Sequence, residues 1–320
     1  MEFFVEKSLF SVYDGGLKYY RKLTEKRGLT VQYLLYNPMS GDGTCKALAE
    51  NYMSRCEWET KLVDMTEIDS YSTLFKILNE NDNIVIFGGD GTLNRFVNDI
   101  KNIEPKSDVY YYPAGTGNDF AADLDKTDTD EPFLINEYIK ALPSVTVNGK
   151  ATVFINGVGY GIDGYCCEIG DKLRAQNKKA NYTAIAIKGL LFHFKPVNAA
   201  VVVDGVEHNY KKVWIAPTMN GRHYGGGMIP TPEQSRTDTD GKLSLMVFHG
   251  SGKLKTLTIF PSIFTGEHIK NPKYVEVLTG KDITVKFDRP TPLQIDGETV
   301  LDVTEYHAVS CVKAKKEIMA

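Results

Sequence analysis

The sequence has few of the features that mark secreted, zinc-ribbon or membrane-spanning proteins. Its 320 residues include 5 cysteines, an odd number without a C-x-x-C pair, which argues against a disulfide framework, a zinc ribbon or a redox centre. No uninterrupted apolar run approaches the roughly 18 residues of a membrane-spanning helix. The first ten residues, MEFFVEKSLF, carry acids where a signal peptide carries bases. We therefore expect a cytoplasmic protein with reduced thiols.

An excess of positive charge is also missing. The chain has 37 Lys and Arg against 41 Asp and Glu, a formal charge of -4, and a pI near 5.9. This balance argues against bulk binding to nucleic acid, which we do not expect as a partner. At roughly 150 residues per domain, the length predicts about two domains.

Several common catalytic motifs are absent as well. There is no G-x-x-x-x-G-K-[ST], H-E-x-x-H or G-x-S-x-G, which excludes P-loop, zincin and α/β-hydrolase chemistry. Residues 159–164 match G-x-G-x-x-G. However, no acid follows about 20 residues later, where a dinucleotide site would need one. We interpret these glycines as turn and close-packing positions.

The first half alternates short apolar strands with amphipathic helices. This pattern is typical of βαβ units, and it predicts a parallel sheet covered on both faces, with ligands at the carboxyl ends of the strands. The predicted strands are 31–36, 61–65, 83–87 and 109–112, and the predicted helices are 44–56, 71–78 and one whose apolar face is Leu93, Phe96, Val97 and Ile100. Residues 17–23 fit an amphipathic helix before the first strand.

From about residue 150 the pattern becomes mostly antiparallel β, interrupted by predicted helices over 182–194 and 254–264. We place an α/β nucleotide domain at 1–145 and a β-rich, sandwich-like acceptor domain at 146–305. A last strand over 306–312 fits either domain, so residues 306–320 can return to the first. The predicted strands of this half are 151–158, 199–203, 212–216, 243–248, 275–278 and 283–287.

Three glycine-rich turns each follow the end of a predicted strand: residues 37–41, 88–92 and 115–119. Glycines let backbone N–H groups approach an anion closely, and the following helix presents its positive dipole end to that anion. The Asp90 carboxylate would repel phosphates unless a divalent cation lay between them, so it is interpreted as a magnesium partner. One such turn is ordinary, but three favour a nucleotide site.

In combination and order, the motifs of this chain are specific. They are Asn37-Pro-x-Ser-Gly41, Gly88-Gly-Asp-Gly-Thr92, Pro113-x-Gly-Thr-x-Asn-Asp119-Phe-Ala121, Asn220-Gly with Gly225-Gly-Gly227, Asp240-Gly-x-Leu243 and Asp296-Gly-Glu298. With them the sequence resembles the diacylglycerol kinase catalytic-domain superfamily, especially soluble bacterial lipid kinases of the diacylglycerol and sphingosine kinase type. The resemblance implies an NAD kinase/diacylglycerol kinase-like α/β domain followed by a mostly antiparallel β-rich domain.

The resemblance also implies a site that uses ATP and Mg²⁺ between the two domains. Glu298 is implied as the general base, Asp119 as its assistant, and Asp90 as the partner of phosphate-bound metal. From the residue pattern alone, Asp296-Gly-Glu298 is favoured as an ordinary hairpin turn. The implied ATP-binding residues are Asn37, Ser40, Gly41, Gly88, Gly89, Asp90, Gly91, Thr92, Asn94, Gly115 and Thr116.

A second, structural magnesium is implied at Asp240, with backbone carbonyls from Thr237 and Lys242. The loop between Pro232 and Asp240 is about two residues longer than the common family form, and Asp238 offers another carboxylate. On spacing alone, an Asp-Gly turn without metal is as well supported.

Residues 172–195 contain six basic side chains and no acid, and they end in the apolar run 189–194. Such a segment suits peripheral contact with the inner face of a membrane. The stronger interpretation is that Ile185, Ile187, Leu190, Leu191 and Phe194 form core under a solvated lysine face. The six basic residues are Lys172, Arg174, Lys178, Lys179, Lys188 and Lys195.

The sequence therefore predicts an ATP-dependent lipid kinase that phosphorylates the primary hydroxyl of a lipid such as diacylglycerol. Two alternatives stay open: an NAD kinase-like kinase with a soluble acceptor, and a nucleotide-binding regulator without turnover. The motifs do not choose among lipid acceptors, because that choice depends on the shape of a cleft. An edge strand of either domain could support a homodimer.

Overall fold

The computed structural model describes residues 30–127, 129–238 and 240–311. The helix predicted over 17–23 and the residues after Cys311 lie outside this range. Contacts divide the chain into two compact units. Met1–Asn118 and Lys126–Asn136 form the first unit, and Asp119–Asp125 and Glu137–Ala320 form the second.

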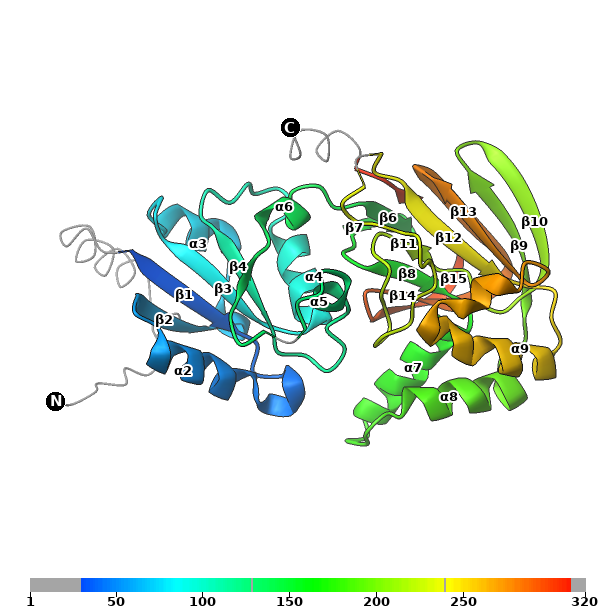
Figure 1. Ribbon diagram of the computed structural model, residues 1–320, viewed down its shortest axis with the longest axis horizontal. Helices are drawn as coiled ribbons and strands as arrows, with labels where there is room; N and C mark the ends of the chain where they lie inside the picture. The colour runs from blue at the N-terminus through cyan, green and yellow to red at the C-terminus, as the bar shows by residue number, and fades with distance from the viewer. Residues whose placement is uncertain (1–29, 128, 239, 312–320) are drawn as a thin grey trace. The chain divides into compact units, whose positions relative to one another are not determined.

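The first unit is built on a five-stranded sheet (Figure 1). Four strands are parallel and the last, short strand is antiparallel. In spatial order the strands are β2 (Glu59–Asp64), β1 (Val31–Tyr36), β3 (Asn83–Gly88), β4 (Val109–Pro113) and β5 (Phe133–Leu134). The helices are η1 (Gly41–Gly43), α2 (Cys45–Arg55), η2 (Met65–Glu67), α3 (Tyr71–Ile77) and α4 (Asp90–Asp99).

The centre of this sheet is apolar on both faces, as a parallel sheet covered by helices requires. Every residue of β1 is buried. On one face Leu34, Val85 and Phe87 pack with Ala49 and Tyr52 of α2. The strands and helices predicted within residues 30–112 are present, with ends shifted by at most two residues.

The second unit contains a ten-stranded sheet in which all strand pairs are antiparallel. The long strand β14 pairs with β9 through residues 283–287 and with β8 through residues 293–295. The strands are β6 (Ser144–Val147), β7 (Lys150–Val153), β8 (Gly157–Tyr160), β9 (Val197–Val203), β10 (Val206–Val213), β11 (Thr218–Met219), β12 (Leu243–Phe248), β13 (Val275–Gly280), β14 (Asp282–Ile295) and β15 (Glu298–Val309).

Aromatic rings fill the interior of this unit. Tyr160 stacks on Phe287 with centroids 3.7 Å apart and meets Tyr306 edge to face. The Tyr160 hydroxyl donates to the Val303 carbonyl, and the Tyr306 hydroxyl bonds Thr218. Each of these two buried phenols has a polar partner, so burying the two rings leaves neither hydroxyl without a hydrogen bond.

Helices cover one side of the second sheet (Figure 1). Strand β12 contributes to both layers, because alternate residues face the sheet interior or the helices. The helical elements of this unit are α5 (Asp119–Asp123), α7 (Ile162–Arg174), α8 (Tyr182–Lys188), η3 (Gly189–His193), α9 (Lys253–Ile259), η4 (Phe260–Thr265) and η5 (Glu267–Lys270), and α6 (Asn136–Ile139) begins at the unit boundary. In the part of the chain that the structure describes, no helix is both long and apolar enough to span a bilayer.

Some sequence expectations for this half differ from the structure. The strand predicted over 151–158 is two strands, β7 and β8, broken at residues 154–156. Only the start of the segment 212–216 lies in β10, where Lys212 has φ 55° and the register with β9 shifts. The helix α7 was not predicted, because three glycines open its sequence.

Those glycines are turn and close-packing positions, as predicted. Gly161 has φ 109°, and a Cβ on Gly159 would lie 1.5 Å from Oδ2 of Asp163. The Asp163 carboxyl, buried at the start of α7, accepts a hydrogen bond of 2.9 Å from Nε2 of Gln294 on β14. Burial raises the pKa of Asp163 to about 6, although the Gln294 bond opposes the shift.

Asp163→Asn should change how the stability of the second unit depends on pH. The pKa of the folded carboxyl lies above its unfolded value near 3.9, so folding favours the protonated form. The free energy of unfolding of wild type should fall by about 3 kcal/mol relative to that of the variant as pH rises from about 4 to about 6. Above that pH the difference should stay constant. Urea unfolding followed by fluorescence of the buried Trp214 measures this. Parallel pH profiles would contradict it.

Candidate functional site

Three loops at the carboxyl ends of β1, β3 and β4 lie in direct backbone contact. A Cβ on Gly115 would approach Cα of Gly89 to 2.4 Å. A Cβ on Gly41, whose φ is 61°, would come within 2.5 Å of the Ala114 carbonyl oxygen. Side chains at these positions would push the loops apart. The three glycine-rich turns therefore form one surface of main chain, as a phosphate-binding site requires.

Thr92 joins the first loop to the start of α4. Its Oγ1 lies 2.8 Å from both Nδ2 of Asn37 and Oγ of Ser40. Gly88 must lack a side chain, because a Cβ there would meet Cβ of Thr92 at 2.6 Å. Asn37 and Ser40 therefore hold the loop in place through Thr92.

Helix α4 begins at Asp90, with Gly89 as its N-cap. The first N–H groups of a helix have no acceptor within it, and its dipole end is positive, so this turn favours an anion. Gly91 is the next helical residue and carries no side chain to cover those groups. Asn94, one turn further on, is buried and accepts from Nδ2 of Asn98. The role of Asn94 in binding ATP stays a prediction.

The turn after β4 is held by a local hydrogen-bond pair. Oδ1 of Asn118 accepts from the Gly115 N–H at 3.0 Å, and Nδ2 of Asn118 donates to the Gly115 carbonyl at 2.9 Å. Asn118 has φ 52°, a conformation that asparagine tolerates better than most residues. Thr116 is left exposed at the tip of this turn.

The donor set of these loops suits a divalent cation that arrives with phosphate. Asp90 supplies a hard oxygen ligand beside the amide surface, and phosphate oxygens would supply others. Across residues 30–127, 129–238 and 240–311 no cluster of three or more His, Cys, Asp or Glu could hold a metal. Asp90 alone would therefore contribute little affinity for a free cation.

In the second unit, Asp119 is buried at the start of α5. Its two carboxylate oxygens accept from the backbone N–H groups of Gly226 and Gly227, at 2.8 and 2.7 Å. Residues 225–227 have φ values of 63°, 81° and 103°, which only glycine adopts without strain. Asp119 therefore holds the triglycine loop in place.

Glu298 follows a two-residue turn between β14 and β15. Ile295 pairs with Glu298, and Asp296 and Gly297 have φ 46° and 91°, so the turn is of type I′. The hairpin-turn interpretation was correct, and it is compatible with a chemical role because Glu298 is exposed at the start of β15. Oε1 of Gln294 accepts from the Gly297 N–H at 2.6 Å, which ties the turn to β14.

The carboxylate of Asp296 anchors this hairpin. Oδ1 accepts from the N–H groups of Asn156 and Gly157 at 2.8 and 2.9 Å, and Oδ2 accepts from the Ile155 N–H at 2.5 Å. The segment 155–157 comprises the last two residues of the break between β7 and β8 and the first residue of β8. Asp296 therefore explains both the interrupted strand and the fixed position of the turn that carries Glu298.

The loop predicted to hold a second metal is exposed. Nζ of Lys242 lies 3.5 Å from Oδ2 of Asp240, and the Lys242 carbonyl accepts from Nε2 of Gln234 at 3.0 Å. Asp238 Oδ1 accepts from the Asp240 N–H, and Thr237 is exposed beside it. The Lys242 side chain thus already places a positive charge beside the Asp240 carboxylate, and a magnesium ion held by Asp240, Thr237 and Lys242 stays a prediction.

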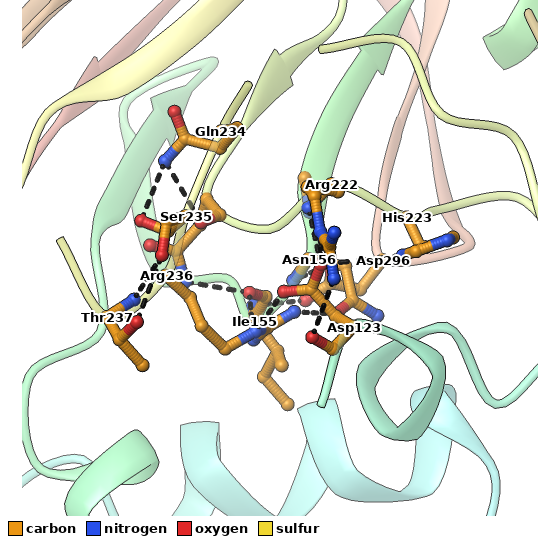
Figure 2. Close-up of polar contacts among 12 residues, drawn as sticks. Asp123, Ile155, Asn156, Arg222, His223, Gln234, Ser235, Arg236, Thr237 and Asp296 are labelled. Atoms are coloured by element: carbon orange, nitrogen blue, oxygen red, sulfur yellow. Dashed lines mark hydrogen bonds and ion pairs between the residues drawn. The ribbon is translucent and has the colours of Figure 1, made fainter. Parts of the chain in front are cut away.

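The sequence analysis missed a buried ionic centre, which includes Arg236, the residue before Thr237 (Figure 2). Asp123, at the end of α5, accepts from Nε of Arg236 at 2.5 Å and from the Arg222 N–H at 2.8 Å. Nδ1 of His223 lies 3.4 Å from the same carboxylate. Arg236 also reaches the Ile155 carbonyl and Oδ1 of Asn156 at 3.2 and 2.9 Å.

Positive and polar partners stabilise the ionised form of Asp123 in this centre. Burial alone would raise the pKa of Asp123, but the His223 hydrogen bond, the Arg236 charge and the Arg222 amide together hold it well below its usual range. The Arg236 side chain is only 4% exposed and lies over the Phe120 ring, 4.7 Å from its centroid. No local pattern in the sequence indicates this centre, because Asp123 is separated from Arg222 by 99 positions and from Arg236 by 113.

The candidate residues thus fall into two groups, one in each unit. The first unit brings Asn37, Ser40, Thr92 and the glycines of the three loops together with Asp90. The second unit joins Asp119 to the triglycine loop, and it holds Glu298 by a hairpin that shares the 155–157 segment with Arg236.

Comparison with known proteins assigns this arrangement to a class. Residues 32–145 match the diacylglycerol kinase catalytic domain, and residues 156–312 match the YegS C-terminal NAD kinase beta sandwich-like domain. The chain belongs to the diacylglycerol kinase catalytic-domain superfamily, and it is a phosphotransferase with an alcohol acceptor. The fold class predicted from the sequence is confirmed.

Individual relatives agree over most of their length. The chain is 25% identical over 271 residues to a diacylglycerol kinase of Mycobacterium tuberculosis, covering 80% of this chain and 84% of that protein. It is 25% identical over 277 residues to a diacylglycerol kinase of Bacillus subtilis, covering 83% and 88%. A crystal structure of a diacylglycerol kinase from Bacillus anthracis has the same fold, with TM-score 0.54, 16% identity, and coverage of 88% of this chain and 94% of that one.

Asp296→Asn should destabilise the second unit, because an Asn Nδ2 would face a backbone donor where Oδ2 now accepts. The expected cost is about 1.5–3 kcal/mol, typical of hydrogen bonds to a charged acceptor. Asparagine keeps the positive φ, so the turn itself is not strained. Asp302→Asn is the control, since Asp302 is exposed with φ 55°. Equal Trp214 unfolding midpoints for both variants in urea would contradict the anchor.

Asp123→Asn should cost about 3–5 kcal/mol, because it leaves Arg236 buried without its counter-charge. The folded pKa of Asp123 lies below its unfolded value. Its contribution is therefore present at neutral pH and lost as pH falls. The variant should show a weaker acid dependence of Trp214 unfolding than wild type. Asp125→Asn, two residues away and exposed, should stay within about 0.5 kcal/mol. A small effect of Asp123→Asn would show that the ion pair contributes little.

Proposed function

We propose that the protein is an ATP-dependent lipid kinase that transfers the γ-phosphate to the primary hydroxyl of a lipid such as diacylglycerol. The relatives named diacylglycerol kinase support this acceptor class. The structural observation that carries the proposal is the anchored hairpin. A carboxylate, Glu298, is held exposed after a turn that three backbone amides fix through Asp296.

The first unit would hold the donor. The amide groups of the loops at Gly41, Gly89 and Gly115 would bind phosphate oxygens, helped by the positive end of α4. Asn37 and Ser40 would keep the first loop closed on Thr92. These groups would position the donor before reaction, which is the larger part of catalysis in phosphoryl transfer.

Asp90 would hold Mg²⁺ against the phosphates. Bound there, the cation would supply charge neutralisation to the oxygens that become more negative as the bond to the leaving group breaks. The structure offers the hard oxygen donor that magnesium prefers and a main-chain surface for the phosphates.

Glu298 would accept the proton of the acceptor hydroxyl as the oxygen attacks phosphorus. An alcohol has a pKa far above 7, so a positioned carboxylate raises the rate of attack. Asp119 would act one step removed, through the loop at Gly226 and Gly227 that its carboxylate holds. This indirect assistance to the base is part of the proposal.

Glu298→Gln should lower kcat by about 100-fold or more, since it removes only the base. The Glu298 side chain is exposed, so the unfolding free energy should change by less than about 0.5 kcal/mol. The assay is transfer of labelled phosphate from ATP with Mg²⁺ to diacylglycerol in mixed micelles. The matched control is Glu305→Gln on the same strand, which removes an exposed carboxylate paired with Lys286 at 3.7 Å.

A panel of acceptors distinguishes the proposal from its alternatives. Label on NAD or on a soluble alcohol, and none on lipid, would replace the lipid acceptor. ATP binding without transfer to any acceptor would indicate a regulator. Full activity of Glu298→Gln on diacylglycerol would contradict the role of Glu298 while leaving the lipid acceptor intact.

A further inference from the structure

Two segments of the second unit, far apart in sequence, meet with large apolar side chains exposed. Ile187 on α8 is 46% exposed, Phe192 on η3 is 73% exposed, and Leu254 on α9 is 79% exposed. Side chains of this size are normally covered, and several together mark a surface that contacts another apolar phase. We refer to these three residues, with Lys188, Lys195, Lys253 and Lys255, as the α8–α9 patch.

The two segments are joined by a direct contact. Nζ of Lys253 donates to the Leu191 carbonyl at 2.7 Å, so Phe192 and Leu254 each follow a residue of this link. Figure 1 shows α8 and α9 on the same side of the second sheet. Leu190 and Phe194 pack inward with Ile259 and Ile263, which fixes both segments to the core.

The two segments that form the patch carry charges of one sign. Residues 175–195 and 252–266 contain no Asp or Glu, and all four lysines of the patch are exposed. Part of the basic run predicted from the sequence does not belong here. Lys172 and Arg174 pair with Glu168 and Asp171 on α7, so these two charges are compensated locally.

The sequence offered two interpretations of residues 182–194, core or membrane contact, and the structure divides the segment between them. Ile185, Leu190 and Phe194 are buried, whereas Ile187 and Phe192 are not. The change from α-helix to π-helix at Gly189 accompanies this division. Gly189 itself has no room for a side chain, because a Cβ would lie 2.7 Å from the Tyr165 ring.

We propose that the α8–α9 patch docks on the surface of an anionic phospholipid bilayer. Phe192, Leu254 and Ile187 enter the boundary between headgroups and acyl chains, and the four lysines contact acidic headgroups. The purpose assigned to this contact, access to an acceptor embedded in the bilayer, rests on the proposed lipid kinase activity. The contact itself does not depend on it.

The test is co-sedimentation of the full chain with two kinds of vesicle, without ATP or diacylglycerol. One kind is phosphatidylcholine alone, and the other is phosphatidylcholine and phosphatidylglycerol in equal parts. Wild type should prefer the anionic vesicles and lose binding as salt rises. Phe192→Ser with Leu254→Ser, and separately Lys188→Glu with Lys255→Glu, should each lower the partition coefficient about tenfold or more.

Matched controls lie elsewhere on the second unit. Val206→Ser removes an exposed apolar side chain from β10, and Lys211→Glu with Lys281→Glu reverses two exposed lysines. These variants should bind vesicles like wild type. Circular dichroism of each variant checks that the fold is retained.

Three results would overturn the proposal: no preference of wild type for anionic vesicles, equal binding by patch and control variants, or a wild-type dimer that Phe192→Ser with Leu254→Ser converts to a monomer. The last result would assign the patch to a second copy of the chain. Activity on a short-chain diacylglycerol dispersed in detergent, measured in parallel, separates the two hypotheses. Patch variants should keep this activity. If wild type lacks it, the proposed function is rejected, while the docking result still stands.

Discussion

The segment from Ile155 to Gly157 is the point on which the candidate chemistry of the second unit depends. Its three N–H groups all donate to the Asp296 carboxylate, which fixes the turn before Glu298. The Asn156 carbonyl accepts from the N–H groups of Asn220 and Gly221. Its side chain and the Ile155 carbonyl bind Arg236, and through Arg236 they reach Asp123 on α5. A break between two strands is thereby shared by three separate parts of the chain.

This arrangement explains why polar groups are buried here. A buried carboxylate or guanidinium loses much hydration energy, and an ion pair rarely adds net stability over apolar packing. The stability of the unit has another source, the apolar core around Tyr160, Phe287 and Tyr306. The directional hydrogen bonds at residues 155–157 instead fix where neighbouring groups lie. A proton acceptor or a glycine loop depends on such fixed placement.

The sequence predicted most of the first unit, because its signals are local. Strand and helix periodicity, the glycines after β1, β3 and β4, and Asp90 at a helix start depend on residues a few positions apart. The second unit was harder to predict, because its defining contacts join residues that are far apart in the sequence. Nothing near Asp296 in the sequence shows that its carboxylate reaches residues 155–157, about 140 positions earlier. Asp163 and Gln294 are likewise separated by 131 positions, and the glycines at 159 and 164 concealed a helix whose packing required them.

The same distinction separates the two acidic residues of Asp296-Gly-Glu298. The sequence pattern of the motif predicts a turn. The structure agrees, since Asp296 and Gly297 supply the two positive φ angles. In the proposed function, the same turn is what holds Glu298 in place to serve as a base. The Asp296 carboxylate is buried and accepts three hydrogen bonds from backbone amides. Glu298, two residues on, is exposed on the adjoining strand. One short hairpin thus assigns its two carboxylates to different tasks. Exchanging their positions would place a longer side chain among amides spaced for aspartate and would shorten the reach of the exposed carboxylate.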